Sequence, residues 1–131
     1  MKPALQVEVG MDLIEIERIE DAMKRHPDGF SKRVFTPVEN AYCGKKKNAS
    51  LHYAGRFAAK EAVLKALGTG LRGGIHWTDV EVTNDMLGKP AATLTGKALE
   101  IALQKNMMQL EISITHCKGF ASAVAVLVRS Y

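Results

Sequence analysis

The stretch LHYAGRFAAKEAVLKALGTG at residues 51–70 decides the fold, because it predicts the longest helix of the chain and the place where that helix ends. The Ser50 hydroxyl can cap the start of the helix, and Gly68 follows Leu67 where a left-handed residue commonly closes a helix. Small side chains recur along the run and allow another element to approach closely: Ala54, Ala58, Ala62 and Ala66. We therefore expect a central helix over 51–67 packed against the rest of the fold.

Upstream of this helix, apolar and polar residues alternate from Leu5 to Gly10, which is the period of a strand with one buried face. The strand is expected to stop near Gly10. From Asp12 the apolar residues recur at helical spacing, so Asp12 is expected at a strand-to-helix junction. The segment Pro27-Asp28-Gly29 is expected to end that helix.

Short elements fill the remaining sequence. Thr36-Pro37-Val38-Glu39 predicts a helix that starts with a capping box and ends at Gly44. Alternation and turn residues then predict two strands joined by the hairpin NDMLGKP, a helix and two further strands, at 80–83, 91–95, 97–105, 110–115 and 121–128. This order predicts an α+β fold with a mainly antiparallel sheet packed against a long helix.

Composition favours one soluble domain over residues 1–131. The chain has 47% hydrophobic and 24% charged residues, which suits an ordinary globular core. No apolar run approaches the roughly 18 residues of a membrane span, and the N-terminus lacks a signal-peptide pattern. Two cysteines are too few for a disulfide framework, so we expect a cytoplasmic protein that does not associate with membranes.

Charge is distributed unevenly along the chain. Residues 18–72 hold twelve Lys or Arg against five Asp or Glu, whereas the rest of the chain holds six against nine. Such a basic surface favours an anionic partner, which could be a nucleic acid, a phosphorylated small molecule or an acidic protein.

Glu61 and Lys65 lie four residues apart on the central helix and therefore share a face. A solvated ion pair is the ordinary explanation of such a pair. Asp12 is, taken alone, most often a helix N-cap. A carboxylate at a strand end together with one on a packed helix is also what Mg²⁺ uses, with water and phosphate oxygens completing its ligands. The residues permit metal-assisted phosphate chemistry without establishing it.

The other reactive side chains have no recognised chemical signature. His116 is expected at the end of a strand, and Cys117 has no nucleophile motif around it. The loop GTGLRGG matches neither nucleotide-binding glycine fingerprint. The few aromatic residues do not interleave with basic ones, so we expect no nucleic-acid partner.

Three segments together resemble the bacterial holo-acyl-carrier-protein synthases, a family of 4′-phosphopantetheinyl transferases. They are VGMDLIEIERI at 9–19, AGRFAAKEAVLKALGTG at 54–70 and SITHCKGFA at 113–121, and they occur in the order and spacing of that family. The resemblance implies transfer of phosphopantetheine from coenzyme A to a serine of apo acyl carrier protein, with release of adenosine 3′,5′-bisphosphate and a requirement for Mg²⁺.

Site residues follow from the motif match. The resemblance implies that Asp12 and Glu61 hold the metal and that Lys65 pairs with the phosphates. Glu61 is also implied to activate the serine, either directly or through a metal-bound water. The coenzyme A cleft is implied to include Arg56, Lys65, Gly68 and His116.

Partners are implied as well. The acidic carrier protein is expected to dock on Arg18 and Arg25 of the first helix, and a homotrimer with sites between subunits is expected. The alternative is a non-enzymatic basic module that binds an acidic protein or a nucleic acid. Such a module would bind in a salt-dependent manner without regard to Mg²⁺.

Overall fold

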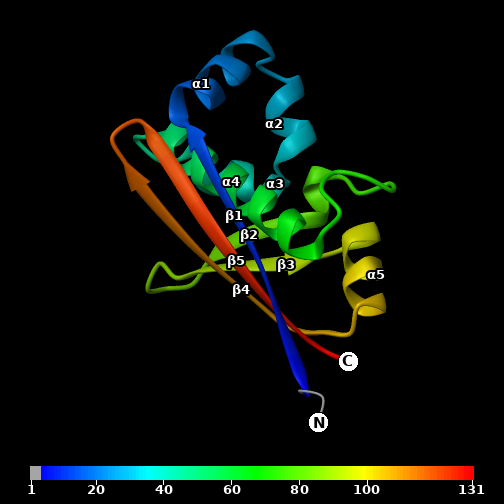
Figure 1. The fold of residues 1–131 in the computed structure, drawn as a ribbon. Coiled ribbons are helices and arrows are strands. Elements are labelled where there is room, and N and C mark those ends of the chain that lie inside the picture. The colour runs from blue at the N-terminus through cyan, green and yellow to red at the C-terminus, as the bar shows by residue number, and fades with distance from the viewer. Residues whose placement is uncertain (1–3) are drawn as a thin grey trace.

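The computed structural model describes residues 4–131 as five helices, five strands and one short 3₁₀ turn (Figure 1). In chain order they are β1 Leu5–Glu15, α1 Ile16–Arg25, α2 Gly29–Val34, α3 Pro37–Gly44, α4 Ala49–Leu67, η1 Trp77–Asp79, β2 Val80–Asn84, β3 Pro90–Leu94, α5 Gly96–Gln104, β4 Met107–Cys117 and β5 Phe120–Ser130. The α+β class is confirmed.

The main sheet has the order β1-β5-β4 and is antiparallel throughout. Helix α4 lies along one face of this sheet and contacts all three strands (Figure 1). A second sheet of β2 and β3 also contacts α4 through β2, while β3 lies against β4. The central helix is therefore enclosed by both sheets and by α1 and α3, which explains why small residues recur along it.

Strand β1 departs from its expectation in length and facing. It continues past Gly10 to Glu15, and its apolar row Leu5, Val7 and Val9 is 49–59% exposed. The face towards α4 instead carries Gly10, where an added Cβ would lie 1.9 Å from the Ala62 carbonyl oxygen. The expected buried face was thus wrong for the single chain, because the glycine side is the one that fits against the helix.

Asp12 lies inside β1, where it pairs with Ala123 of β5. Helix α1 begins only at Ile16, and its N-cap is Glu15 in extended conformation. The expected junction at Asp12 and the N-cap interpretation are therefore both wrong. The sheet pairing holds Asp12 next to α4 instead.

The predicted helix ends are mostly confirmed. Thr36 and Glu39 form the capping box of α3, which ends at Gly44, and Gly68 closes α4 in left-handed conformation at φ 80°. The start of α4 differs, because Asn48 rather than Ser50 is its N-cap and no side chain bonds there. Helix α2 was not predicted, since six residues are too few for a periodic pattern.

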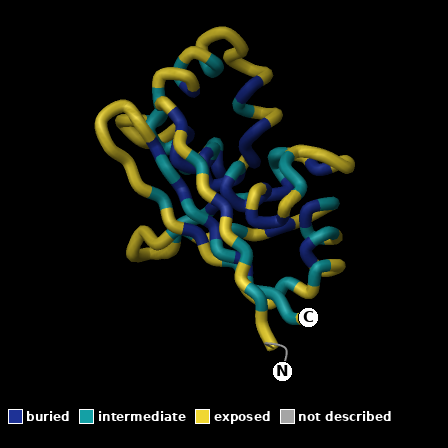
Figure 2. Tube along the Cα trace, viewed as in Figure 1, coloured by how far each residue is buried: buried dark blue, intermediate teal, exposed yellow. Residues whose placement is uncertain are grey.

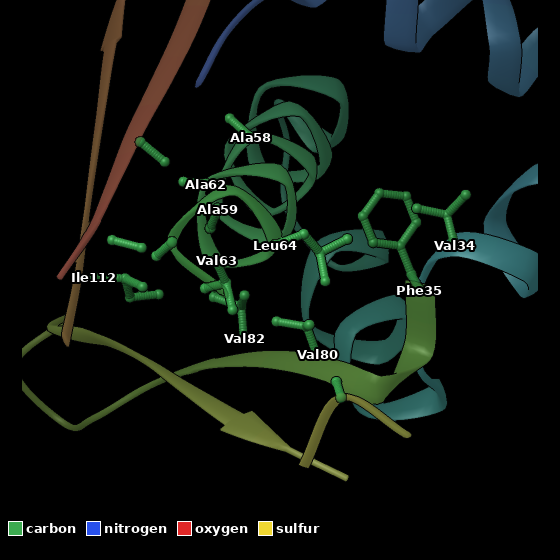
Figure 3. Packing of buried hydrophobic residues seen from close by; sticks show 14 of the residues in the cluster. Val34, Phe35, Ala58, Ala59, Ala62, Val63, Leu64, Val80, Val82 and Ile112 are labelled. Atoms are coloured by element: carbon green, nitrogen blue, oxygen red, sulfur yellow. The ribbon is translucent and has the colours of Figure 1, made fainter. Parts of the chain in front are cut away.

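The hydrophobic core lies between α4 and the two sheets (Figure 3). Val63 and Leu64 of α4 face Val80 and Val82 of β2, and Leu64 also lies towards Phe35 (Figure 3). The buried stretches in Figure 2 follow α4 and the strands beside it. Within residues 4–131 no helix is long and apolar enough to cross a membrane.

Candidate functional site

Asp12 and Glu61 line one pocket of about 310 Å³, which we call the Asp12 pocket. Asp12 comes from the middle of β1 and Glu61 from the neighbouring turn of α4, two elements in direct contact. Phe30 and Phe57 form part of the apolar wall, and Arg18 of α1 stands at the edge. The sequence-predicted carboxylates are thus brought together.

The environment raises the pKa of Glu61. Burial contributes most, and the negative charge of Asp12 adds to it, while Lys65 acts in the opposite direction. Two carboxylates that repel one another in a partly buried pocket are favourable to a cation. Mg²⁺ commonly takes only one or two protein carboxylates. The pair therefore fits such an ion, although no cluster of three or more His, Cys, Asp or Glu side chains occurs among the described residues.

Lys65 pairs with Asp12 and not with Glu61, the partner that helical spacing favours. Its Nζ lies 3.2 Å from Asp12 Oδ1 and donates to the Met11 carbonyl oxygen at 2.8 Å. The Lys65 side chain is 51% exposed, so its ammonium remains available to a ligand.

A second pocket of about 300 Å³, the Lys65 pocket, lies beside this lysine. Gly68 lines it, and so do two cations that the sequence did not single out, Lys105 and Arg129. Lys105 donates to the Leu67 carbonyl at the end of α4, and Arg129 pairs with Glu8. Nothing in the local sequence distinguishes these two, because the fold alone brings β5 and the end of α5 to the glycine loop.

Arg56 and His116 line a third pocket of about 210 Å³, the Arg56 pocket. Arg56 is buried, its guanidinium lies 4.1 Å from the Tyr42 ring centroid, and Nη2 donates to Asn84 Oδ1 at 2.6 Å. Arg56 Nε is buried without a hydrogen-bond partner among the described residues. Arg56 also lines the pocket, where its positive charge attracts an anionic group.

Two histidines border the Arg56 pocket. His116 is the penultimate residue of β4, which runs to Cys117, so its predicted place at a strand end is confirmed. The ring centroid of His52 lies 6.5 Å from that of His116. Burial and then the charges of Lys46 and Arg56 lower the pKa of His52, so this ring is neutral at pH 7. The other lining residues missed by the sequence interpretation are Tyr42, Gly55, Asn84, Gly88, Pro90 and Ile114.

The four residues implied to bind coenzyme A fall into two groups in one chain. Lys65 and Gly68 line the Lys65 pocket, whereas Arg56 and His116 line the Arg56 pocket. Arg56 and Lys65 are separated by nine helical residues, or about 13 Å along the axis. The implied docking residues Arg18 and Arg25 are both exposed on α1, and only Arg18 reaches the Asp12 pocket.

Comparison with known proteins identifies the family of this chain. Residues 8–125 match the family described as the 4′-phosphopantetheinyl transferase superfamily. This chain belongs to that superfamily. Holo-[acyl-carrier-protein] synthase of Geobacter sp. (strain M21) is 48% identical over 120 residues, which cover 92% of this chain and 96% of that protein.

Solved structures of the same kind share the fold. Helicobacter pylori holo-[acyl-carrier-protein] synthase in complex with coenzyme A superposes with a TM-score of 0.81 at 35% identity, covering 91% of this chain and 98% of that one. The Bacillus anthracis holo-(acyl-carrier-protein) synthase in complex with CoA (3′,5′-ADP) gives 0.78 at 36% identity, covering 97% and 100%. The resemblance read from the three sequence segments is thereby confirmed.

Proposed function

We propose that this chain transfers 4′-phosphopantetheine from coenzyme A to a serine of apo acyl carrier protein and requires Mg²⁺ to do so. The observation that carries the proposal is the Asp12 pocket, where two carboxylates meet and Lys65 lies in contact with one of them. Membership of the superfamily and the coenzyme A-bound relative support the same reaction.

In this reaction the serine oxygen attacks the phosphorus that carries pantetheine, and the bond from that phosphorus to the oxygen of adenosine 3′,5′-bisphosphate breaks. Bound Mg²⁺ would polarise the phosphate oxygens and neutralise charge that develops on the leaving group. Asp12 and Glu61 hold the cation, and Lys65 pairs with a phosphate oxygen as a point charge. Glu61 is also the carboxylate that we assign to accept the serine proton.

The nucleotide portion of coenzyme A is assigned to the Arg56 pocket, where the Arg56 guanidinium and His116 meet an anionic group. The phosphates next to the metal are assigned to Lys65 and to the loop at Gly68. The acidic carrier docks on Arg18 and Arg25, so that its serine can approach the Asp12 pocket.

A homotrimer with sites between subunits accounts for two features of the single chain. The outer face of β1 exposes an apolar row that a neighbouring copy would cover; its members are Leu5, Val7, Val9, Met11 and Leu13. The second feature is that the Arg56 pocket and the Asp12 pocket are separate in the single chain. In a trimer, the Arg56 pocket of one subunit would adjoin the Asp12 pocket of its neighbour. We further propose a cytoplasmic location.

The test is a direct mass measurement. The purified chain is mixed with apo acyl carrier protein, coenzyme A and Mg²⁺, and the intact mass of the carrier is followed with and without EDTA. A gain of one phosphopantetheine that disappears with EDTA supports the proposal. No gain with a competent carrier would reject it and favour a binding module.

Asp12→Asn and Glu61→Gln are the informative variants, because each removes one metal-ligand charge and keeps the shape. Loss of transfer in both, with the fold intact, is expected. Full activity in either variant would remove that carboxylate from the proposed site.

A further inference from the structure

Within residues 4–131, strand β2 has a strand partner on one edge and none on the other. Thr95 N donates to Asp79 O at 2.8 Å and Asp85 N donates to Lys89 O at 2.9 Å, which fixes the bonded pairs between β2 and β3. In an antiparallel ladder the bonded residues alternate, so the backbone groups of Val80 and Val82 point away from β3. This outer edge needs other partners, since both residues are fully buried.

A buried ion pair takes the place of a neighbouring strand there. Lys60 of α4 donates to the Val80 carbonyl, and Val82 N donates to Glu39 Oε2 at 2.7 Å. Lys60 Nζ and Glu39 Oε1 lie 2.8 Å apart, and both side chains are completely shielded from solvent. Figure 3 shows the Val80 and Val82 side chains pointing towards α4, so this face of β2 packs against the same helix that provides Lys60.

The same strand ends at the Arg56 pocket. Asn84, the last residue of β2, accepts the hydrogen bond from Arg56 Nη2. Arg56 and Lys60 are one helical turn apart and share a face of α4. Helix α4 therefore holds β2 at its first residue through Lys60 and at its last residue through Arg56, with Glu39 bonded to the residue between them.

We propose that Glu39 and Lys60 are positioning residues for coenzyme A: their ion pair sets the placement of β2 on α4 and so keeps Asn84 against Arg56. The inference rests on the proposed function of the Arg56 pocket. Neither residue touches that pocket. Apolar residues of similar volume would fill this space but would not bond the Val80 carbonyl or Val82 N, so the pair does at this edge what a neighbouring strand would do.

The experiment compares three variants, Lys60→Met, Glu39→Gln and the double variant Glu39→Met/Lys60→Met. Each is assayed for coenzyme A affinity by calorimetry and for kcat and both KM values in transfer. Because each leaves a buried group of the β2 edge unpaired, we expect coenzyme A affinity to fall about tenfold or more, with kcat and the carrier KM nearly unchanged.

The double variant separates positioning from simple stability. It removes both charges together, so no buried charge is left unpaired and part of the thermal stability lost in Lys60→Met should return. Coenzyme A affinity should stay low, because Val80 O and Val82 N still lack their partners. The control is Ala102→Gly in α5, a buried change at a residue that neither bonds β2 nor lines the Arg56 pocket. All proteins are compared at the same interval below their own Tm, and the control should bind coenzyme A like wild type.

Coenzyme A affinity within twofold of wild type in the ion-pair variants would overturn the inference, and so would an equal loss in Ala102→Gly. If the variants do not fold, hydrogen exchange of the backbone amides in the wild-type protein tests the inference instead. Val82 N–H should exchange as slowly as the amides of β5, and exchange as fast as at the exposed Met86 would overturn the inference. Failure of wild type to bind coenzyme A would instead reject the proposed function.

Discussion

Glu61 is subject to opposite demands from cation binding and from folding. Its pKa is raised by burial and by Asp12, so its charge is less favourable in the folded chain than in the unfolded one. Glu61→Gln should therefore lower the rate of transfer about 100-fold or more, which is the usual effect of losing one contact to the transition state. Its Tm should stay equal or rise, because a partly buried charge is removed. Mass-based transfer assays and thermal unfolding test this.

The control for that substitution is Glu100→Gln, which changes an exposed glutamate of α5 in the same way. It should leave both activity and Tm unchanged. A Glu61→Gln protein that loses stability together with activity would contradict the electrostatic explanation.

The same raised pKa predicts how metal dependence changes with pH. Glu61 is protonated at a higher pH than an ordinary glutamate, so protons compete with the cation earlier as the solution becomes acidic. The Mg²⁺ concentration for half-maximal transfer should rise from neutral to mildly acidic pH. Glu61 also makes the free energy of unfolding depend on pH. Because its pKa is higher in the folded chain than in the unfolded one, its stabilising contribution is complete below the unfolded pKa and is lost as pH rises through the folded pKa.

The pH dependence of stability in Asp12→Asn distinguishes the coupling of the two carboxylates from a general effect of acid. Without the Asp12 charge, the pKa of Glu61 should fall and the stability profile should shift to lower pH. An unchanged profile would show that the two carboxylates are not coupled.

The two cysteines should differ sharply in reactivity. Cys43 is completely buried, and burial raises its pKa to about 11, whereas Cys117 is exposed at the end of β4. Because the thiolate is the reactive form, an alkylating reagent should label one cysteine in the native protein and both in denaturant. Mass spectrometry of labelled peptides measures this. Cys117→Ser should abolish native labelling, and rapid labelling of Cys43 would contradict the packing around α3.

At the scale of elements, the contact between β1 and α4 depends on Gly10. An added Cβ would lie 1.9 Å from the Ala62 carbonyl oxygen and 2.7 Å from Ala66 N, and helix backbone cannot move aside locally. Gly10→Ala should lower the free energy of unfolding by about 3 kcal/mol, at the upper end of overpacking effects. Denaturant unfolding measures the change.

Gly44→Ala is the matched control, because no atom lies within 4 Å of its added Cβ and its φ is not positive. It should be neutral or slightly stabilising. Equal effects at the two glycines would show that close approach is not the reason for Gly10.

The sequence predicted those elements whose signals are local. The capping box of Thr36 and Glu39, the Gly68 stop and the alternation at β2 each depend on neighbouring residues, and all were confirmed. The facing of β1 was not predictable, because period-two alternation identifies two faces without saying which one meets the helix. Only the position of Gly10 opposite Ala62 decides it.

The candidate site was predictable to the same limited degree. Asp12, Glu61 and Lys65 were found through motifs, whereas Lys105 and Arg129 reach the Lys65 pocket only because the fold brings distant segments together. The partner of Lys65 was also unexpected, since the helix spacing favoured Glu61 and the strand supplied Asp12.

For the whole molecule, the exposed row on β1 predicts assembly. Val9→Glu places a charge in the centre of this row and should convert a trimer, three times the chain mass of 14.3 kDa, into monomer. Light scattering after gel filtration measures the mass. Met86→Glu is the control, because Met86 is fully exposed on the β2–β3 turn and away from the row. A wild-type monomer with full activity would reject the assembly.

Mixed oligomers test whether the site is divided between subunits. Arg56→Ala and Glu61→Gln chains should each be inactive alone, and co-refolded mixtures should regain part of the activity if one subunit supplies the Arg56 pocket and its neighbour the Asp12 pocket. No recovery would place both pockets of one site in the same chain.

The pairing of Leu5 with Ser130 joins the two ends of the chain through β1 and β5. Among the described elements β1 is synthesised before all others, yet the strand that pairs with it there is β5, which comes after them in the chain. A nascent chain must therefore carry β1 without its strand neighbour until β5 has been made, which slows folding and favours aggregation of unfinished chains. Chains truncated before β5 should consequently depend on chaperones to remain in solution.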